Sequence, residues 1–182
     1  VQVHRFDGDW EDIGTIKSFY EANLELTHAD PPFELASIDA PIYSRSRSLP
    51  PSRFGEATIR DSLIADGCMI EQGAVIENSV IGLRCLIGRD VQVRNSILMG
   101  NDYYEAPHEI AEGKCNGRPP LGVGPGTRIQ GAIVDKNCRI GRNVQIVNRR
   151  DVDASDESEH CMIRDGIVVV PKGATLPDEW AL

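Results

Sequence analysis

Residues 62–88 read SLIADGCMIEQGAVIENSVIGLRCLIG, and the spacing of their apolar residues indicates the fold of the chain. Its aliphatic residues recur with neither the helical period of about 3.6 nor the strand period of about 2. The residues that end successive apolar clusters, here and on either side, are Ile59, Ile64, Ile70, Ile76, Ile81, Ile87, Val93 and Leu98. They are spaced by 5, 6, 6, 5, 6, 6 and 5 residues, so the larger period is 17 residues.

Hexapeptide spacing of this kind is typical of a parallel β-helix. Each step is a short strand and a corner, three steps complete a triangular coil, and successive coils pair at about 4.8 Å. Each inward aliphatic residue should then stack on its equivalent one coil away. The predicted stacks are Ile64 on Ile81 on Leu98, Ile70 on Ile87, and Ile59 on Ile76 on Val93. Repeats of this class form left-handed coils, an exception to the right-handed crossover rule.

The fourth residue after each inward aliphatic residue should be small, because it also points inward near a corner. The residues at this place are Cys68, Ala74, Cys85, Val91, Cys138 and Val144. Three of the five cysteines are therefore expected to be apolar fillers and not nucleophiles. An odd number of cysteines without CxxC spacing fits neither a disulfide framework nor a zinc site, and it predicts reduced thiols in a cytoplasmic protein.

Two interruptions break the repeat. Leu98 and Ile129 are 31 residues apart where two steps need 12, so about 19 residues form an extra loop near 100–120. Turn-forming residues run throughout that loop. A second interruption near 148–161 precedes a last coil, whose predicted inward residues are Val170, Leu176 and Leu182. The open edge of this coil needs a cover, which Trp180 or another subunit could supply.

The first residues follow a different pattern. Residues 15–27 carry apolar side chains at helical spacing after Thr15, a suitable N-cap, so they predict a helix. Residues 29–53 are rich in proline and predict a connector. A helix and a connector cannot form a core of their own, and we expect them to belong to another domain whose remainder lies upstream of Val1.

The length and composition of the chain argue against some classes of function. The chain has 182 residues, which favours one domain or one domain plus a fragment. No run approaches the 20 or so apolar residues of a membrane span. The net charge of −9 argues against non-specific binding to nucleic acid or to an anionic membrane.

Several strings together resemble one family, glucose-1-phosphate adenylyltransferase (ADP-glucose pyrophosphorylase), and especially its cyanobacterial and plant type. The strings are WEDIGT (10–15) with SFYEAN (18–23), APIY (40–43) with LPPS (49–52), LMG (98–100) with DYY (102–104), IVDKN (133–137) and GIVVV (166–170). The resemblance runs from Val1 to about Asp178 and is specific only when the strings are taken together. It implies residues 1–28 as the end of an α/β nucleotidyltransferase domain, 29–53 as a connector and 54–182 as a left-handed β-helix.

The resemblance also implies an activity for the full-length protein. Members of the family use Mg²⁺ to join ATP and glucose-1-phosphate into ADP-glucose and pyrophosphate, in glycogen or starch synthesis. They are homo- or heterotetramers in the cytoplasm or, in plants, the plastid. Their C-terminal β-helix contributes to oligomerisation and to allosteric control by glycolytic metabolites and phosphate. This chain alone is expected to be inactive.

Asp12 matches the family aspartate in the WxDxGT string that helps to hold the catalytic Mg²⁺. One or two carboxylates together with substrate phosphates suit Mg²⁺. The alternative for Asp12 is an acidic side chain that favours the dipole of the following helix. Asp9 stands where the family usually has tyrosine, and the second metal-binding aspartate has no counterpart in this sequence.

Four basic residues match positions at or near the family's effector site. Arg47 matches an arginine of the connector, and Arg45 stands where glutamine is usual. Lys172 matches the activator-binding lysine near the C-terminus, and Arg149 stands where a second lysine is usual. Converging cations suit a phosphorylated effector, since arginine makes bidentate contacts and lysine acts as a point charge. The expected effector is 3-phosphoglycerate, with fructose bisphosphates as alternatives; each cation could also belong simply to a solvated face.

Two alternatives belong to other functional classes. A free-standing hexapeptide acyltransferase would need a histidine as general base, for which His108 on the extra loop is the only candidate. A β-helix scaffold without a ligand would need no site. Neither alternative explains the WEDIGT string and the helix after it.

Overall fold

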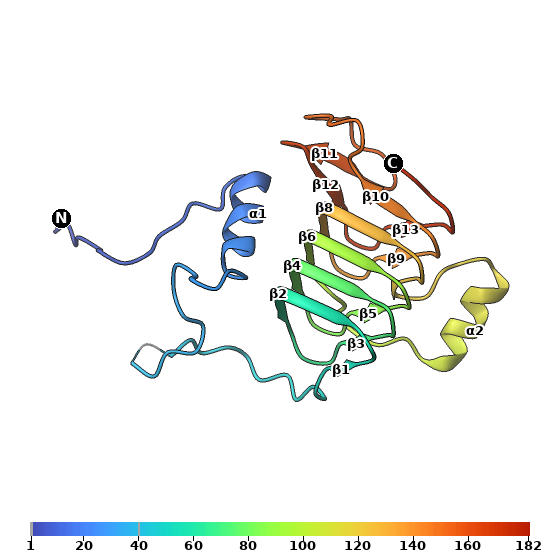
Figure 1. Cartoon of the computed structure of the whole chain (residues 1–182), viewed down its shortest axis with the longest axis horizontal. Coiled ribbons are helices and arrows are strands. Elements are labelled where there is room, and N and C mark those ends of the chain that lie inside the picture. Colours follow the sequence, from blue (N-terminus) through green and yellow to red (C-terminus); the bar gives the residue numbers. More distant parts are fainter. Residues whose placement is uncertain (1, 40) are drawn as a thin grey trace.

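The computed structural model describes residues 2–39 and 41–182. Val1 and Ala40, the first residue of the APIY string, lie outside the described residues. The chain is mainly β, as predicted: a helix and a connector precede a stack of coils with parallel strands (Figure 1). Within the described part, no helix is both long enough and apolar enough to cross a membrane.

Two parallel sheets run along the stack. The sheet of long strands has the order β11-β12-β8-β6-β4-β2. Its strands are β2 (Thr58–Ile64), β4 (Val75–Ile81), β6 (Gln92–Leu98), β8 (Arg128–Val134), β11 (Met162–Arg164) and β12 (Ile167–Val170), and β10 (Gln145–Val147) also pairs with β8. The sheet of short strands consists, in order, of β1 (Arg53–Phe54), β3 (Met69–Ile70), β5 (Leu86–Ile87), β7 (Gly122–Val123), β9 (Arg139–Ile140) and β13 (Thr175–Leu176). All pairs are parallel except β11 with β12.

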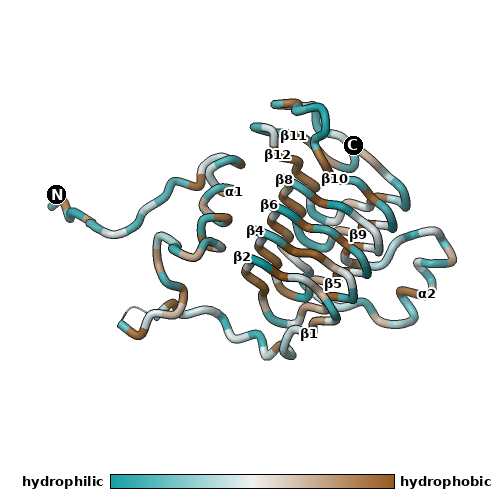
Figure 2. Tube along the Cα trace, in the orientation of Figure 1, coloured by the Kyte–Doolittle hydropathy of each residue, from teal (hydrophilic) through white to brown (hydrophobic). Residues whose placement is uncertain are grey.

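The register confirms the predicted stacks. Ile64 pairs with Ile81, and Ile81 pairs with Leu98. The other two predicted stacks are present as well. Figure 2 shows hydrophobic segments recurring at the same place on successive strands. All six predicted small-residue positions are buried in the same core cluster. The core is therefore a set of columns, each made from one position of the 17-residue repeat.

Each five-residue step contains a left-handed corner. The corner residues have positive φ and are Asp61 (44°), Asn78 (44°), Asn95 (46°) and Gly131 (65°). Asp, Asn and Gly are the residues that tolerate this conformation best. The long strands bend there, and the register skips the corner residue in each pair.

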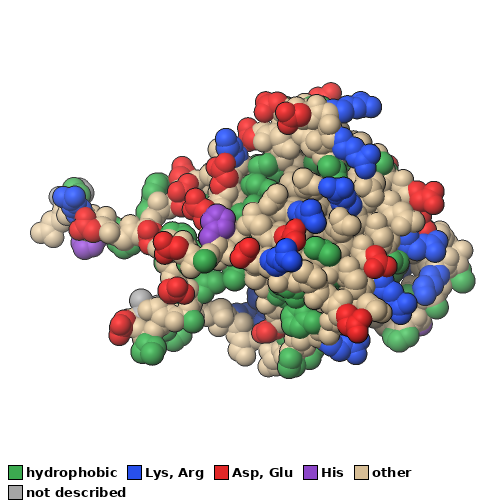
Figure 3. Space-filling view, viewed as in Figure 1, with side chains coloured by type: hydrophobic (Ala, Val, Ile, Leu, Met, Phe, Trp, Pro, Cys, Tyr) green, Lys and Arg blue, Asp and Glu red, His purple; other side chains and the backbone are tan. Residues whose placement is uncertain are grey.

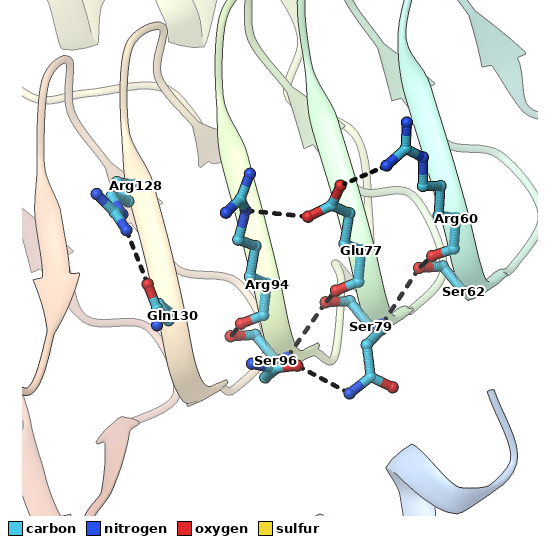
Figure 4. Close-up of polar contacts among 10 residues, drawn as sticks. Arg60, Ser62, Glu77, Ser79, Arg94, Ser96, Arg128 and Gln130 are labelled. Carbon is cyan, nitrogen blue, oxygen red and sulfur yellow. Dashed lines mark hydrogen bonds and ion pairs between the residues drawn. The ribbon is translucent and has the colours of Figure 1, made fainter. Parts of the chain in front are cut away.

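A serine ladder supports the backbone beside this corner (Figure 4). The amides of Ser79, Ser96 and Ala132 each donate to the serine hydroxyl of the preceding coil at 3.2 Å. Each of those hydroxyls donates to the carbonyl two residues before it at 2.7 Å. The ladder therefore satisfies backbone groups next to the corner that would otherwise be buried without partners.

Two insertions account for the interruptions, and both have the same length. Leu98 pairs with Val134, and Val134 pairs with Val170, so each pair is separated by 36 residues instead of 17. The first insertion is 102–120 and the second is 148–166. The second is longer than the predicted interruption at 148–161, because β11 forms a hairpin with β12 through an Asp165–Gly166 turn with two positive φ angles.

The prediction that the first interruption is loop throughout was wrong. It contains α2 (Pro107–Cys115), which begins with a proline and is capped by Glu109, whose carboxylate accepts from the amide of Ala106 at 2.7 Å. A buried ion pair anchors the insertion: Glu105 lies 2.6 Å from Arg139, and the two side chains are 3% and 12% exposed.

The last coil is covered partly as predicted. Trp180 packs on the core, and the ring of His160 from the second insertion meets it edge-on at 5.8 Å. Val170 and Leu176 are buried. Leu182, predicted to point inward, is 42% exposed.

The predicted helix is α1 (Ile16–Glu25), with Thr15 as N-cap accepting from the amide of Ser18 at 3.0 Å. Its apolar face packs on an outward stripe of the long strands, which was not predicted from the sequence. The stripe residues are Val80, Ile97, Ile133 and Val169. The Tyr20 hydroxyl donates to the carbonyl of Asn95, and the Thr27 hydroxyl lies 2.7 Å from Oδ1 of Asn78, so α1 is also held at the left-handed corner.

Candidate functional site

A cationic pocket lies between the connector and the turns that follow the long strands. Arg45, Ser46 and Arg47 of the connector form one side. Successive turns of the β-helix form the other side, with Leu83, Arg84, Met99, Asn101, Asp102 and Lys136. Four of the nine lining residues are cationic and one is acidic, in a chain whose net charge is −9. In Figure 3, Lys and Arg side chains are spread over the visible face of the β-helix.

Asp102 is the centre of the polar contacts at this pocket. Its carboxylate accepts from Nζ of Lys136 at 2.9 Å and from Nδ2 of Asn137 at 3.0 Å, and it lies 3.3 Å from Nζ of Lys172. Its own amide donates to Oδ1 of Asn137 at 2.8 Å. Hydrogen bonds from Lys136, then Asn137, then Lys172 lower the pKa of Asp102 to about 2, so the group is ionised at neutral pH.

The two lysines occupy equivalent positions of adjacent coils. Val134 pairs with Val170, and each lysine comes two residues later. The carbonyl of Lys136 accepts from the amide of Gly173 at 2.9 Å, which continues the pairing through the turn. Two ammonium groups are therefore brought together by the coil spacing itself, and Asp102 lies between them.

Arg84 is held in place by two neighbours. Its Nη1 donates to the carbonyl of Asn101 at 3.2 Å, and Nδ2 of Asn101 donates back to the carbonyl of Arg84 at 2.8 Å. The guanidinium lies 6.0 Å from the centre of the Tyr104 ring, a cation–π distance. Tyr104 is itself fixed, because its hydroxyl donates to the carbonyl of Gly67 at 2.7 Å. The pocket thus has one preorganised arginine.

The structure brings together three of the four predicted effector residues. Arg45 and Arg47 line the pocket, and Lys172 joins it through Asp102. Arg149 lies in the second insertion, where its Nη2 donates to Oε1 of Gln145 at 3.1 Å, and it is not among the lining residues. Its role in effector binding stays a prediction.

Sequence reasoning missed three charged members of the pocket: Arg84, Asp102 and Lys136. Asp102 and Lys136 lie inside strings that carry the resemblance, yet neither was given a role. A signal was available, since aligning the coils places Lys136 and Lys172 at the same position of the repeat. Arg84 offers no such signal, because its place depends on contacts with Asn101 and Tyr104.

Asp12 alone does not make a magnesium site. It is exposed, and its Oδ1 accepts from the amide of Gly14 at 3.0 Å. Across residues 2–39 and 41–182, no three His, Cys, Asp or Glu side chains are grouped so as to hold a metal ion. Mg²⁺ is commonly held by one or two carboxylates together with substrate phosphates, so Asp12 would supply one ligand of such a site, and its role stays a prediction.

Two other features are weaker candidates for a functional site than the cationic pocket. On the outside of the long strands, Glu77 lies between Arg60 (3.6 Å) and Arg94 (3.1 Å), so these charges pair with one another along the sheet (Figure 4). His108 is exposed on α2 and lines neither this pocket nor the interior of the coils.

One comparison with known proteins identifies the family. The family model described as the GLGC left-handed parallel β-helix domain matches residues 47–181, about three quarters of the chain. The match covers every strand and both insertions, and it confirms the predicted left hand of the coil. The chain therefore belongs to the family of GLGC left-handed parallel β-helix domains, the C-terminal domain of ADP-glucose pyrophosphorylase.

Proposed function

We propose that this chain is the C-terminal regulatory and oligomerisation part of a glucose-1-phosphate adenylyltransferase of the cyanobacterial or plant type. In the full-length enzyme, a nucleotidyltransferase domain with bound Mg²⁺ joins ATP and glucose-1-phosphate to give ADP-glucose and pyrophosphate for glycogen or starch synthesis. Asp12 would contribute one carboxylate to that site. The assembly is a homo- or heterotetramer in the cytoplasm or a plastid.

The cationic pocket is the effector site in this proposal. The observation that carries it is the convergence of Arg45, Arg47, Arg84 and Lys136 on one concavity of an otherwise acidic chain. Arginine can bind a phosphoryl group through two parallel N–H donors, whereas lysine contributes a compact charge. A small molecule with a phosphate and a carboxylate, such as 3-phosphoglycerate, matches this set best, and fructose bisphosphates and inorganic phosphate share the chemistry.

The position of the pocket supports a regulatory role. One wall belongs to the connector and the other to the β-helix, so a bound anion would hold the two together. The connector follows α1, which packs on the stripe of the β-helix. An effector that fixes the connector would therefore bias how the catalytic domain sits on the coils. Allosteric coupling of this kind is typically worth about 1–3 kcal/mol.

Thermal unfolding of this chain with a panel of ligands tests the proposal. A ligand that binds only the folded state raises the melting temperature with concentration. We expect 3-phosphoglycerate and phosphate to do so, acetyl-CoA to have no effect, and Arg47→Ala to remove most of the shift. The control is Lys114→Ala, which removes one exposed positive charge on α2. A response to acetyl-CoA alone would favour an acyltransferase, and no response to any ligand would favour a scaffold.

A further inference from the structure

Asp102 is the one carboxylate among the residues that line the pocket, and it points at the cations instead of away from them. One of its oxygens contacts Lys136, and the other lies near Lys172 and Asn137. A phosphoryl or carboxylate group of an effector would seek the same two ammonium groups. Asp102 therefore stands where an effector oxygen would be expected.

We propose that Asp102 is a built-in competing anion, which pairs with Lys136 and Lys172 until a phosphorylated effector displaces its carboxylate. The inference rests on the proposed function of the pocket and deepens it. Displacement is feasible because the three charged side chains are about half exposed (42–58%), and exposed ion pairs are weak. Without any anion between them, the two lysines would repel each other across adjacent coils.

The movement required is local. Asp102 is the first residue of the first insertion, and the backbone on both sides of it is fixed. The amide of Asn101 donates to the carbonyl of Leu83 at 2.8 Å, and Glu105 is locked in its buried pair with Arg139. Gly100 has a φ of 82°, and a Cβ there would lie 2.1 Å from the carbonyl oxygen of Leu83, so this turn lies directly against the turn of the preceding coil. The side chain of Asp102 can thus rotate away while the insertion stays in place.

The consequence is selection by ligand charge. A monoanion that takes the place of Asp102 replaces one negative charge by another, and it gains little from the two lysines. A phosphoryl group at neutral pH carries between one and two negative charges on three oxygens, so it gains from the lysines and also reaches the arginines. Asp102 would therefore discriminate against chloride, acetate and similar ions that are abundant around any protein.

Titration calorimetry tests this inference. The Asp102→Asn variant and the unchanged chain are each titrated with phosphate, 3-phosphoglycerate and acetate at constant ionic strength. The substitution keeps the shape and the contact with Asn137 but removes the charge. We expect phosphate and 3-phosphoglycerate to bind the variant about tenfold more tightly. Acetate binding should become measurable, so that the preference for phosphate over acetate falls. Asp156→Asn, which removes one exposed charge in the second insertion, should change neither affinity.

The outcomes separate the two proposals. If the unchanged chain binds 3-phosphoglycerate and Asp102→Asn binds it equally or more weakly, Asp102 is a positioning residue for the lysines and the competing-anion inference is wrong, while the effector site stands. If neither protein binds any phosphorylated ligand, the proposed function fails and the inference falls with it.

Discussion

Nζ of Lys136 lies 2.9 Å from a carboxylate oxygen of Asp102, a residue 34 positions earlier in the chain. The contact joins the turn after β8 to the start of the first insertion. It exists because the 17-residue coil brings the turns that follow the long strands into one row. The repeat carries no chemistry of its own, and its contribution to function is to hold charged turns and insertions in register.

Lys172 and Arg149 should differ in their effect on activation of the full-length enzyme. Lys172 lies 3.3 Å from Asp102 at the pocket, whereas Arg149 contacts Gln145 in the second insertion. We expect Lys172→Ala to raise the activator concentration needed for half-maximal stimulation by about tenfold, and Arg149→Ala to raise it less. Initial rates across a 3-phosphoglycerate series measure both values. A larger effect of Arg149→Ala would show that the effector site extends beyond the pocket described here.

Glu105→Gln should destabilise the domain by about 3 kcal/mol, because it leaves the charge of Arg139 buried without its partner. Chemical unfolding measures the free-energy change, and limited proteolysis should show faster cleavage within 102–120. Glu109→Gln, which alters an exposed residue of α2, is the control and should cost less than about 1 kcal/mol. A small loss for Glu105→Gln would contradict the idea that this ion pair anchors the first insertion.

Ser79→Ala should cost about 1–3 kcal/mol, since the amide of Ser96 and the carbonyl of Glu77 would both lose a partner in the interior. The matched variant is Ser62→Ala, which removes the same two contacts at the outermost coil, where Ser62 is partly exposed. Urea unfolding of the two variants should therefore give a clearly larger loss at position 79. Equal losses would mean that burial does not decide the strength of the ladder.

Cys115 should be the fast-reacting thiol of the native chain. It is exposed at the end of α2, whereas the other four cysteines are buried. Burial raises the pKa of Cys138 to about 11, which further slows its reaction because the thiolate is the nucleophile. A colorimetric thiol titration should count one rapid equivalent in the native state and five after unfolding. Cys115→Ser should abolish the rapid phase, and two rapid equivalents would contradict the filler role of the interior cysteines.

Much of the fold could be predicted because the repeat is a local pattern. A spacing of 5, 6 and 6 residues determines which side chains face inward, and stacking then follows from backbone pairing. Ile64, Ile81 and Leu98 therefore stack as predicted. The helix after Thr15 could also be predicted from a local pattern, because an N-cap and apolar residues at helical spacing are enough to indicate it.

The missed features depend on contacts between distant segments. The conformation of the first insertion is anchored by Glu105 and Arg139, which no local pattern links. Leu182 obeys the spacing of six residues, yet its side chain is 42% exposed, so the spacing alone does not decide burial. The outward stripe that receives α1 could have been found, because Val80 and Ile97 occupy the same position of successive coils.

Part of the candidate site was predicted through resemblance and part was not. Arg45, Arg47 and Lys172 came from matching strings, and the structure places them at or beside one pocket. Asp102 and Lys136 needed the coil register as well as the strings. The acidic residue among the cations, Asp102, was not predicted, because a phosphate-binding site is expected to consist of basic residues.

Titration calorimetry with 3-phosphoglycerate shows whether the cationic pocket is the effector site. The proteins compared are the unchanged chain, Lys136→Ala and Lys114→Ala. Lys136 lines the pocket, and losing one charge-assisted contact should weaken binding about tenfold. Lys114→Ala, on α2, should leave the affinity unchanged. Binding by the unchanged chain that falls about tenfold only in Lys136→Ala is the predicted result. Equal affinities for all three proteins, or no binding by any of them, would contradict the assignment of this pocket as the effector site.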